Sequence, residues 1–247
     1  MLKSVQIMLA ITTFYDYEIW QMDFKTSFLN GFLKEELYMM QPEGFLDTKG
    51  TNKVCKLQRS IYGLGQASQS WNICFDSAIK AYGFIQTFGE ACIYKKVSGS
   101  SVAFLILYVD DILLIGNDTE FLDSIKGYLN KNFSVKDFGE AAYILGIKIY
   151  RDRSRCLIGL SQSTYLDKVL KKFKMDQSKK GFMPVLQGVN LNQTQCPTTA
   201  EDREKMKVIP FASAIGSIMY AMLCTRLDVC LAISLPGRYQ SNPGVYH

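Results

Sequence analysis

The sequence predicts a mixed fold, α+β or α/β, with an antiparallel hairpin near its centre. Over residues 1–160, stretches with the two-residue alternation of strands are interleaved with stretches that have helical spacing. Between residues 102 and 116, an apolar strand runs into two aspartates and continues at once as a second apolar strand, the pattern of a tight hairpin. A change of composition near Met175 separates this part from the rest of the chain.

The N-terminal residues 1–14 have the spacing of an amphipathic helix, with Val5, Met8, Leu9 and Ile11 on one apolar face. A signal peptide is the alternative, but the stretch lacks an A-x-A-like cleavage site. The next predicted elements are a strand at 18–24, a short strand at 34–40 closed by a turn at 42–44, and a helix at 66–82.

Further along, strands are predicted at 92–96, 102–109 and 112–116, and a helix capped by Asp118 at 118–129. A hairpin of residues 143–150 and 156–160 precedes a basic amphipathic helix at 163–173. Residues 176–207 are polar and rich in Gln, Asn and Thr, which indicates a linker or extended segment. Residues 211–235 are rich in small residues and are expected to be helical.

The composition is that of a folded protein, because 48% of the 247 residues are hydrophobic and only 21% are charged. The net charge of +5 is compatible with a polyanionic partner without establishing one. The seven cysteines are odd in number and include no C-x-x-C pair, so a reducing, intracellular and cytoplasmic setting is expected. No apolar run reaches the roughly 18 residues of a membrane span, so no membrane partner is expected.

The only histidine is His247, at the last position of the sequence. Within this chain, a Ser-His-Asp triad, an H-E-x-x-H zinc site and a multi-histidine iron site are therefore excluded. Any catalysis has to depend on carboxylates, Lys, Cys, Ser or Tyr.

The carboxylates of Asp110 and Asp111 lie at the predicted tip of the apolar hairpin, in Tyr108-Val109-Asp110-Asp111. The ordinary interpretation is structural, because Asp favours turns. Asn-Gly or Asp-Gly would however be the preferred hairpin turn, and two adjacent like charges are costly unless a cation compensates them. Metal binding is therefore the alternative interpretation of this pair.

A third carboxylate, Asp23, ends the predicted strand at 18–24, where a solvated strand end is the simpler explanation. If this strand neighbours the hairpin, three oxygen donors converge. Mg²⁺ prefers carboxylate oxygens at roughly 2.0–2.1 Å, and Mn²⁺ is an equivalent candidate. Two such ions about 3.5–4 Å apart can hold the attacking 3′-hydroxyl and the leaving phosphate of an in-line displacement.

Several sequence blocks resemble copia-type retrotransposon reverse transcriptases, which are RNA-directed DNA polymerases. The block at 21–31, with its continuation at 36–45, is similar to the first catalytic block of that family, and Tyr108 to Asp111 matches its metal box. Other similar blocks, in the family's order and over nearly the whole chain, are 60–71, 136–140 with 143–147, and 213–220 with 225–226. The Y-x-D-D box alone would be a weak signal, but the ordered series is strong.

The resemblance implies an α+β fold of the polymerase-palm type, an antiparallel sheet backed by helices. Residues 1–160 would be the palm with partial fingers, 161–175 a thumb-like helix, and 176–247 a linker and a connection-like helical tail. The implied partners are an RNA or DNA primer–template and deoxynucleoside triphosphates. The implied cofactor is Mg²⁺ or Mn²⁺, with two ions bound.

The resemblance also implies roles for individual residues. Asp23 and Asp110 would be the principal metal ligands, and Asp111 the supporting carboxylate. Phe28 would lie under the sugar and exclude a 2′-hydroxyl, although a plain core aromatic is the alternative. The other implied substrate contacts are Tyr108 in the metal box, Gln66 at the nucleotide or template, and Lys136 as a proton donor to the pyrophosphate leaving group.

For two of these residues and for Trp71, simpler interpretations exist. Gln66 is otherwise a polar residue at a helix start, Lys136 is otherwise a surface lysine, and Trp71 is assigned to the core. Gly65 stands where the family usually has Lys, and Gln69 where it often has Arg, so positive charge is lost from a nucleic-acid-facing block.

The sequence begins within the helix before the first catalytic block and ends before any ribonuclease H domain. The expectation is therefore a fragment without the upstream fingers, weakly active or inactive alone. The alternatives are a catalytically silent nucleic-acid-binding remnant and a polypeptide with no selected function. Salt-dependent binding of primer–template without nucleotide incorporation would favour the remnant.

Overall fold

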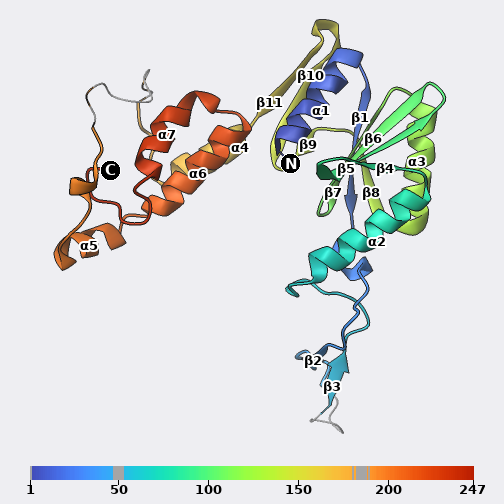
Figure 1. The fold of residues 1–247 in the computed structure, drawn as a ribbon, viewed down its shortest axis with the longest axis horizontal. Coiled ribbons are helices and arrows are strands. Elements are labelled where there is room, and N and C mark those ends of the chain that lie inside the picture. Colours follow the sequence, from blue (N-terminus) through green and yellow to red (C-terminus); the bar gives the residue numbers. More distant parts are fainter. Residues whose placement is uncertain (1, 47–52, 180, 182–187, 189) are drawn as a thin grey trace. The chain divides into compact units, whose positions relative to one another are not determined.

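The computed structural model describes residues 2–46, 53–179, 181, 188 and 190–247 (Figure 1). The chain divides into two compact units. The first consists of Met1–Leu145 with Arg151–Ile158, and the second of Gly146–Tyr150 with Gly159–His247. This division falls near the predicted end of the palm at residue 160, whereas the roles predicted for the individual regions stay predictions.

The first unit is built on a six-stranded antiparallel sheet with the strand order β4-β5-β6-β7-β1-β8. The two central strands, β6 and β7, are the apolar strands of the predicted hairpin and carry the longest runs of buried residues. The strands, in sheet order, are β4 (Ile85–Thr87), β5 (Glu90–Ser98), β6 (Ser101–Tyr108), β7 (Asp111–Gly116), β1 (Glu18–Phe24) and β8 (Val135–Glu140).

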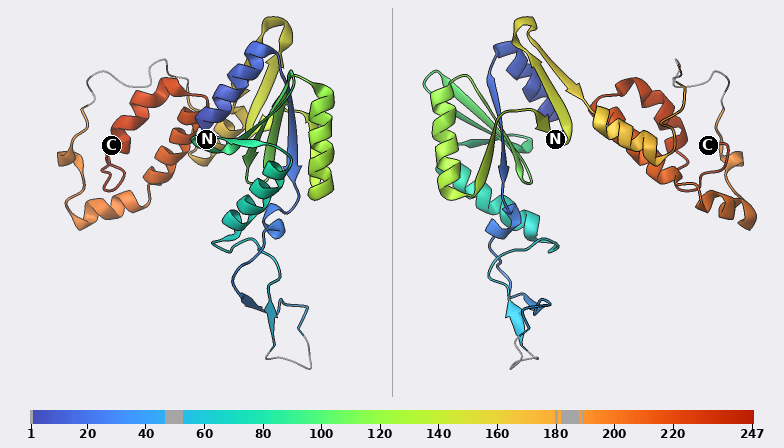
Figure 2. Two further views of the ribbon diagram at one scale, coloured as in Figure 1. Left: turned by 45° about the vertical axis from the view of Figure 1, so that its right-hand side comes forward. Right: turned by 180° about the vertical axis from the view of Figure 1, so that it is seen from behind.

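Helices cover both faces of this sheet. Figures 1 and 2 show α1 (Leu2–Tyr15) and α3 (Thr119–Asn132) on opposite sides of it. The predicted apolar face of α1 is buried at Val5, Met8 and Leu9, and α2 (Ala67–Ala81) joins α3 on the main core. Side chains from alternate strand positions meet both helices in that core, among them Met22, Phe24, Ile112, Leu114, Trp71, Phe75, Leu122 and Ile125. The alternation and the helical spacing in the sequence therefore correspond to real buried faces.

Smaller elements complete the chain. A two-stranded sheet pairs β2 (Tyr38–Met40) with β3 (Val54–Lys56), and a three-stranded sheet has the order β11-β10-β9. The strands of the latter are β9 (Tyr143–Ile144), β10 (Ile147–Asp152) and β11 (Leu157–Ser161). The helices that follow are α4 (Ser163–Lys172), α5 (Ala200–Lys207), α6 (Phe211–Cys224) and α7 (Cys230–Gly237).

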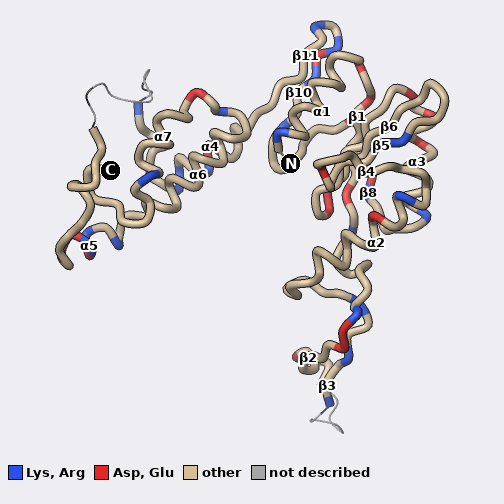
Figure 3. The backbone as a smooth tube through the Cα atoms, viewed as in Figure 1, with Lys and Arg blue, Asp and Glu red and all other residues tan. Residues whose placement is uncertain are grey.

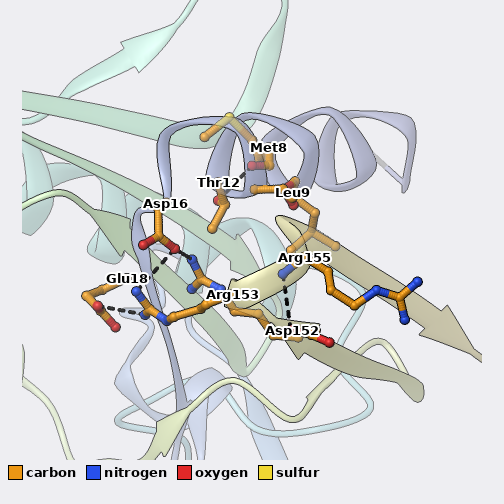
Figure 4. Close-up of polar contacts among 10 residues, drawn as sticks. Met8, Leu9, Thr12, Asp16, Glu18, Asp152, Arg153 and Arg155 are labelled. Carbon is orange, nitrogen blue, oxygen red and sulfur yellow. Dashed lines mark hydrogen bonds and ion pairs between the residues drawn. The ribbon is translucent and has the colours of Figure 1, made fainter.

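Within the first unit, ion pairs join Arg151 and Arg153 to the turn between α1 and β1 (Figure 4). Arg151 Nη2 lies 2.6 Å from Asp16 Oδ1, and Arg153 bridges Asp16 at 3.2 Å and Glu18 at 2.7 Å. The Arg151 side chain is almost fully buried, so this pair is more shielded from solvent than an ordinary surface ion pair. The network holds the start of β1 in place, and Asp23 is the second-to-last residue of that strand.

Several sequence predictions need correction. The strand predicted at 34–40 is reduced to residues 38–40, because the preceding residues form no ladder. The strand predicted at 143–150 is broken into β9 and β10, since Leu145 and Gly146 both have positive φ, at 54° and 73°. The edge strands β4 and β8 were not predicted, because their short sequences show little apolar alternation.

The C-terminal predictions were also incomplete. The segment predicted as a linker over 176–207 contains the helix α5, whose start is capped by the Thr199 hydroxyl; residues 180, 182–187 and 189 of that segment lie outside the described residues. The helix predicted at 211–235 is divided into α6 and α7, which share a small core of Ile215, Met222 and Ile233. In the described part of the chain, no single helix is long and apolar enough to cross a membrane, and only the bent pair of α5 and α6 meets the criteria by length and composition.

The aromatic centre of the main core provides a stability test. Phe75 is fully buried and contacts the rings of Phe24, Trp71 and Tyr94, so truncation would leave a cavity. We expect Phe75→Ala to lower the free energy of unfolding by about 3–5 kcal/mol, measured by denaturant titration. The matched change Phe88→Ala, at a fully exposed ring, should alter it by no more than about 0.5 kcal/mol. Equal effects of the two changes would contradict the assignment of this core.

Candidate active site

The acidic residues lie where β1 meets the hairpin of β6 and β7. Strands β1 and β7 are antiparallel neighbours, and Asp23 pairs directly with Asp111 across the ladder. The backbone N–H of Phe24 donates to the carbonyl oxygen of Asp110 at 2.8 Å. Three carboxylates from segments far apart in the sequence are thus brought to one end of the sheet.

The tip of the hairpin differs in detail from the expectation of two aspartates at the turn. Val109 and Asp110 form the turn, whereas Asp111 is the first residue of β7. Val109 has a φ of 55°, a left-handed conformation that is unfavourable for a β-branched residue. Its carbonyl oxygen accepts a hydrogen bond of 2.8 Å from the Trp71 indole Nε1. Asp111 therefore belongs to the sheet, whereas Asp110 belongs to a turn that Trp71 restrains by its hydrogen bond to Val109.

The carboxylates repel one another. Partial burial and the charge of Asp110 raise the pKa of Asp23, while the charge of Lys136 opposes this rise. Partial burial raises the pKa of Asp111 as well, and the charges of Asp23 and Asp110 add to the effect, against a hydrogen bond from Gln21. One carboxylate oxygen of Asp110 is buried and has no hydrogen-bond partner among the residues that the structure describes. The group is short of positive charge and of hydrogen-bond donors.

This donor set fits a hard divalent cation, which prefers carboxylate oxygens and would relieve the repulsion. Among the described residues, no Lys or Arg forms an ion pair with Asp23, Asp110 or Asp111. The side chains are not, however, already gathered as ligands. In the described part of the chain, no group of three or more His, Cys, Asp or Glu side chains is arranged to hold a metal ion. Rotation of the carboxylates would be required on binding.

Phe28 packs against Tyr62. It belongs to a short helical turn, Ser27–Asn30, and its ring centroid lies 4.7 Å from that of Tyr62. Partial burial and the charges of Asp110 and Asp23 raise the pKa of the Tyr62 hydroxyl. Sequence reasoning gave Tyr62 no role, although it lies in the block at 60–71. The effect of the carboxylates on its pKa depends on a fold that the block does not reveal.

The remaining predicted residues lie on different elements: Tyr108 on β6, Lys136 on β8 and Gln66 directly before α2. Tyr108 ends β6, pairs with Asp111 and is exposed. Lys136 of β8 pairs with Asp23 of β1, and the Lys136 ammonium lies 4.6 Å from the Phe138 ring centroid. Lys136 is thus an exposed lysine whose charge reaches the carboxylates.

Gln66 precedes α2 directly, as its sequence position predicted. It lines a groove of about 460 Å³ together with residues of α2 and of the segment after Phe28, among them Gln69, Ser70, Ile73, Phe32 and Lys34. In the described chain it forms no hydrogen bond with the carboxylates, so the structure brings the three acids to one end of the sheet but leaves Gln66 at the start of α2. The catalytic and binding roles of all these residues stay predictions.

The repulsion among the carboxylates predicts a pH-dependent stability. The pKa of Asp111 in the folded protein is raised above its ordinary value of 3.8, so the folded protein binds this proton more tightly than the unfolded chain does. The folded protein therefore loses stability as the pH rises from 3.8 through the raised pKa. We expect Asp111→Asn to unfold at higher denaturant concentration than the unmodified protein at pH 7, with a difference that vanishes at or below pH 3.8. Asp118, whose pKa is lowered by hydrogen bonds from Ser101 and the Phe121 N–H, is the control of opposite sign. Asp118→Asn should not stabilise at pH 7, and the same gain from both changes would contradict this account.

Comparison with known proteins identifies the family of the chain. The sequence profile of the reverse transcriptase (RNA-dependent DNA polymerase) family matches residues 1–187. Over its whole length the chain is 41% identical to the retrovirus-related Pol polyprotein from transposon TNT 1-94 of Nicotiana tabacum, of which it covers 19%. It is 30% identical, over 99% of its length, to the polyprotein from transposon RE1 of Arabidopsis thaliana, of which it covers 16%.

A shorter relative is the putative transposon Ty5-1 protein of Saccharomyces cerevisiae, which is 28% identical over 92% of this chain and 71% of its own length. No solved structure matches the chain. The chain spans less than a fifth of the plant polyproteins that it resembles. The match nevertheless covers the sheet, the hairpin and the three aspartates, so the chain belongs to the reverse transcriptase (RNA-dependent DNA polymerase) family, as the reverse transcriptase region of a copia-type Pol polyprotein.

Proposed function

We propose that this region carries out nucleotidyl transfer with two metal ions held by Asp23, Asp110 and Asp111. The observation that carries the proposal is the pairing of β1 with β7, which sets Asp23 opposite Asp111 and next to the turn that bears Asp110. Asp23 and Asp110 are the principal ligands, and Asp111 supports them. When bound, the divalent ions supply charge stabilisation to the attacking and leaving oxygens of the phosphoryl group.

The other residues near the acidic group select and orient the nucleotide. Phe28 and Tyr62 present two packed rings, a rigid surface on which a deoxyribose can lie. A 2′-hydroxyl would have to fit against the Phe28 ring, which disfavours ribonucleotides. Lys136 donates a proton toward the leaving pyrophosphate, and Gln66 contacts the nucleotide or template from the start of α2.

The proposed partners are a primer–template and deoxynucleoside triphosphates, in an intracellular setting. Lys and Arg residues recur along the chain (Figure 3). In α4 and the residues that follow it, four lysines are exposed: Lys168, Lys171, Lys172 and Lys174. These lysines would contact the phosphates of the primer–template, and phosphate contacts carry no sequence preference. Gly65 and Gln69 leave the start of α2 without charge, so we expect a low rate of synthesis by residues 1–247 alone.

Primer extension with a single carboxylate removed tests the proposal. With Mn²⁺ or Mg²⁺ and a primed RNA template, we expect slow extension by residues 1–247 and a further loss of at least about 100-fold in Asp110→Asn, because charge stabilisation of the transferred phosphate is lost. The matched change Asp123→Asn, at an exposed carboxylate of α3, should leave the rate unchanged. Extension that survives Asp110→Asn would refute the assignment. Salt-dependent primer–template binding with no extension in any variant would favour the silent nucleic-acid-binding remnant instead.

The role of Phe28 predicts a change in sugar selection. We expect Phe28→Ala to raise the incorporation of ribonucleotides relative to deoxyribonucleotides by roughly tenfold or more, because the ring that meets the 2′-position is removed. The ratio is obtained from single-nucleotide extension with each triphosphate. Phe32→Ala is the control, since that exposed ring lies in the same segment and contacts Arg59 instead of Tyr62. An unchanged ratio in Phe28→Ala would assign the ring to packing alone.

A further inference from the structure

Trp71 of α2 contacts both of the segments that carry the principal carboxylates. Its indole ring packs edge-on against Phe24, the residue after Asp23, with the ring centroids 4.9 Å apart. Its Nε1–H donates to the carbonyl oxygen of Val109, the residue before Asp110, at 2.8 Å. The side chain is only 2% exposed, so both contacts are shielded from water.

The turn at Val109 needs such a restraint. Its φ of 55° is strained for a β-branched residue, and conformations of this kind persist only where the surroundings hold them. The Val109 side chain is 42% exposed and contributes little packing that could hold the turn. The indole N–H supplies instead a directed bond to its carbonyl, inside the core that the ring itself fills.

The segment that carries Phe28 is attached to the same turn of α2. A Cβ atom at Gly31 would lie 2.9 Å from the Ser70 Cβ and 3.0 Å from the Trp71 backbone nitrogen, so the chain can approach the helix this closely only with glycine. Trp71 therefore contacts all three segments: the strand that carries Asp23, the turn that carries Asp110 and the segment that carries Phe28.

We infer that Trp71 is a positioning residue for the acidic group, and that its indole N–H sets the orientation of the Asp110 turn relative to Asp23. Packing alone would be satisfied by any large ring, whereas this role requires the donor. The inference rests on the proposed function in one respect, namely that these carboxylates act as metal ligands. The restraint that Trp71 places on the turn at Val109 can be measured without any metal.

The sequence offers a matched pair of changes, because the chain has two tryptophans. Trp71→Phe keeps a ring in the core and removes the donor. Trp20→Phe makes the same chemical change on β1, at a ring that contacts the Lys126 ammonium at 3.4 Å and whose residue pairs with Leu114 of β7, outside residues 109–112. Amide hydrogen exchange in the metal-free protein should become faster at residues 109–112 in Trp71→Phe and stay unchanged there in Trp20→Phe. Equal exchange at 109–112 in both variants would overturn the inference.

The metal-dependent measurement uses Mn²⁺ binding followed by electron paramagnetic resonance. We expect Trp71→Phe to weaken Mn²⁺ binding by about tenfold, the usual effect of losing a group that orients a metal ligand, and Trp20→Phe to leave it unchanged. Asp110→Asn should remove most of the binding. If the unmodified protein binds no Mn²⁺, the metal site of the proposed function fails, while faster exchange at 109–112 in Trp71→Phe would still support the hold on the turn.

A third measurement needs no change at Trp71, in case Trp71→Phe does not fold. In Trp20→Phe, the single remaining indole N–H should give a nuclear magnetic resonance signal that exchanges slowly with water, and Mn²⁺ should broaden it. Rapid exchange of this signal would show that the bond to Val109 is not maintained in solution and would overturn the inference.

Discussion

The antiparallel pairing of β1 with β7 is the constraint on which the site depends. In this register Asp23 faces Asp111, while Met22 and Phe24 on either side of it point into the main core. A slip of one residue would turn Asp23 into that core and expose Phe24, since strand side chains alternate between faces. The burial of the apolar positions thus fixes the position of the carboxylate, and the ion pairs of Asp16 and Glu18 hold the other end of the strand.

Placing three carboxylates at one end of the sheet has an energetic cost that the rest of the unit offsets. The raised pKa values of Asp23 and Asp111 show that ionisation is opposed by burial and by mutual repulsion. The strained turn at Val109 adds to this cost. The neighbouring aromatic core, with Phe24, Trp71 and Phe75 in contact, is the part of the unit able to oppose it. An acidic group that forms no ion pair with a Lys or Arg of the described residues is typical of a site that a ligand completes, which agrees with the family of the chain.

Much of the fold followed from patterns in the sequence. The strands of the central hairpin, the strand that carries Asp23 and the helix preceded by Gln66 were predicted to within about two residues, because each carries a strong apolar period. The edge strands β4 and β8 and the helix α5 were missed, since short or polar elements carry little periodicity and are stabilised by neighbours or caps. The acidic residues were predicted as a group, while Tyr62 and the bond from Trp71 to Val109 were not.

The sequence by itself determined the chemistry available to this protein. With His247 as the only histidine and acids ending apolar strands, metal-dependent chemistry on carboxylates was the most economical choice, and the ordered motifs pointed to the reverse transcriptase family. Only the tertiary structure decided which of these groups meet. Strand register, the closeness of Gly31 to α2 and the indole bond to the hairpin join segments far apart in the chain. Local periodicity cannot encode such contacts, because they arise from packing between elements and not within them.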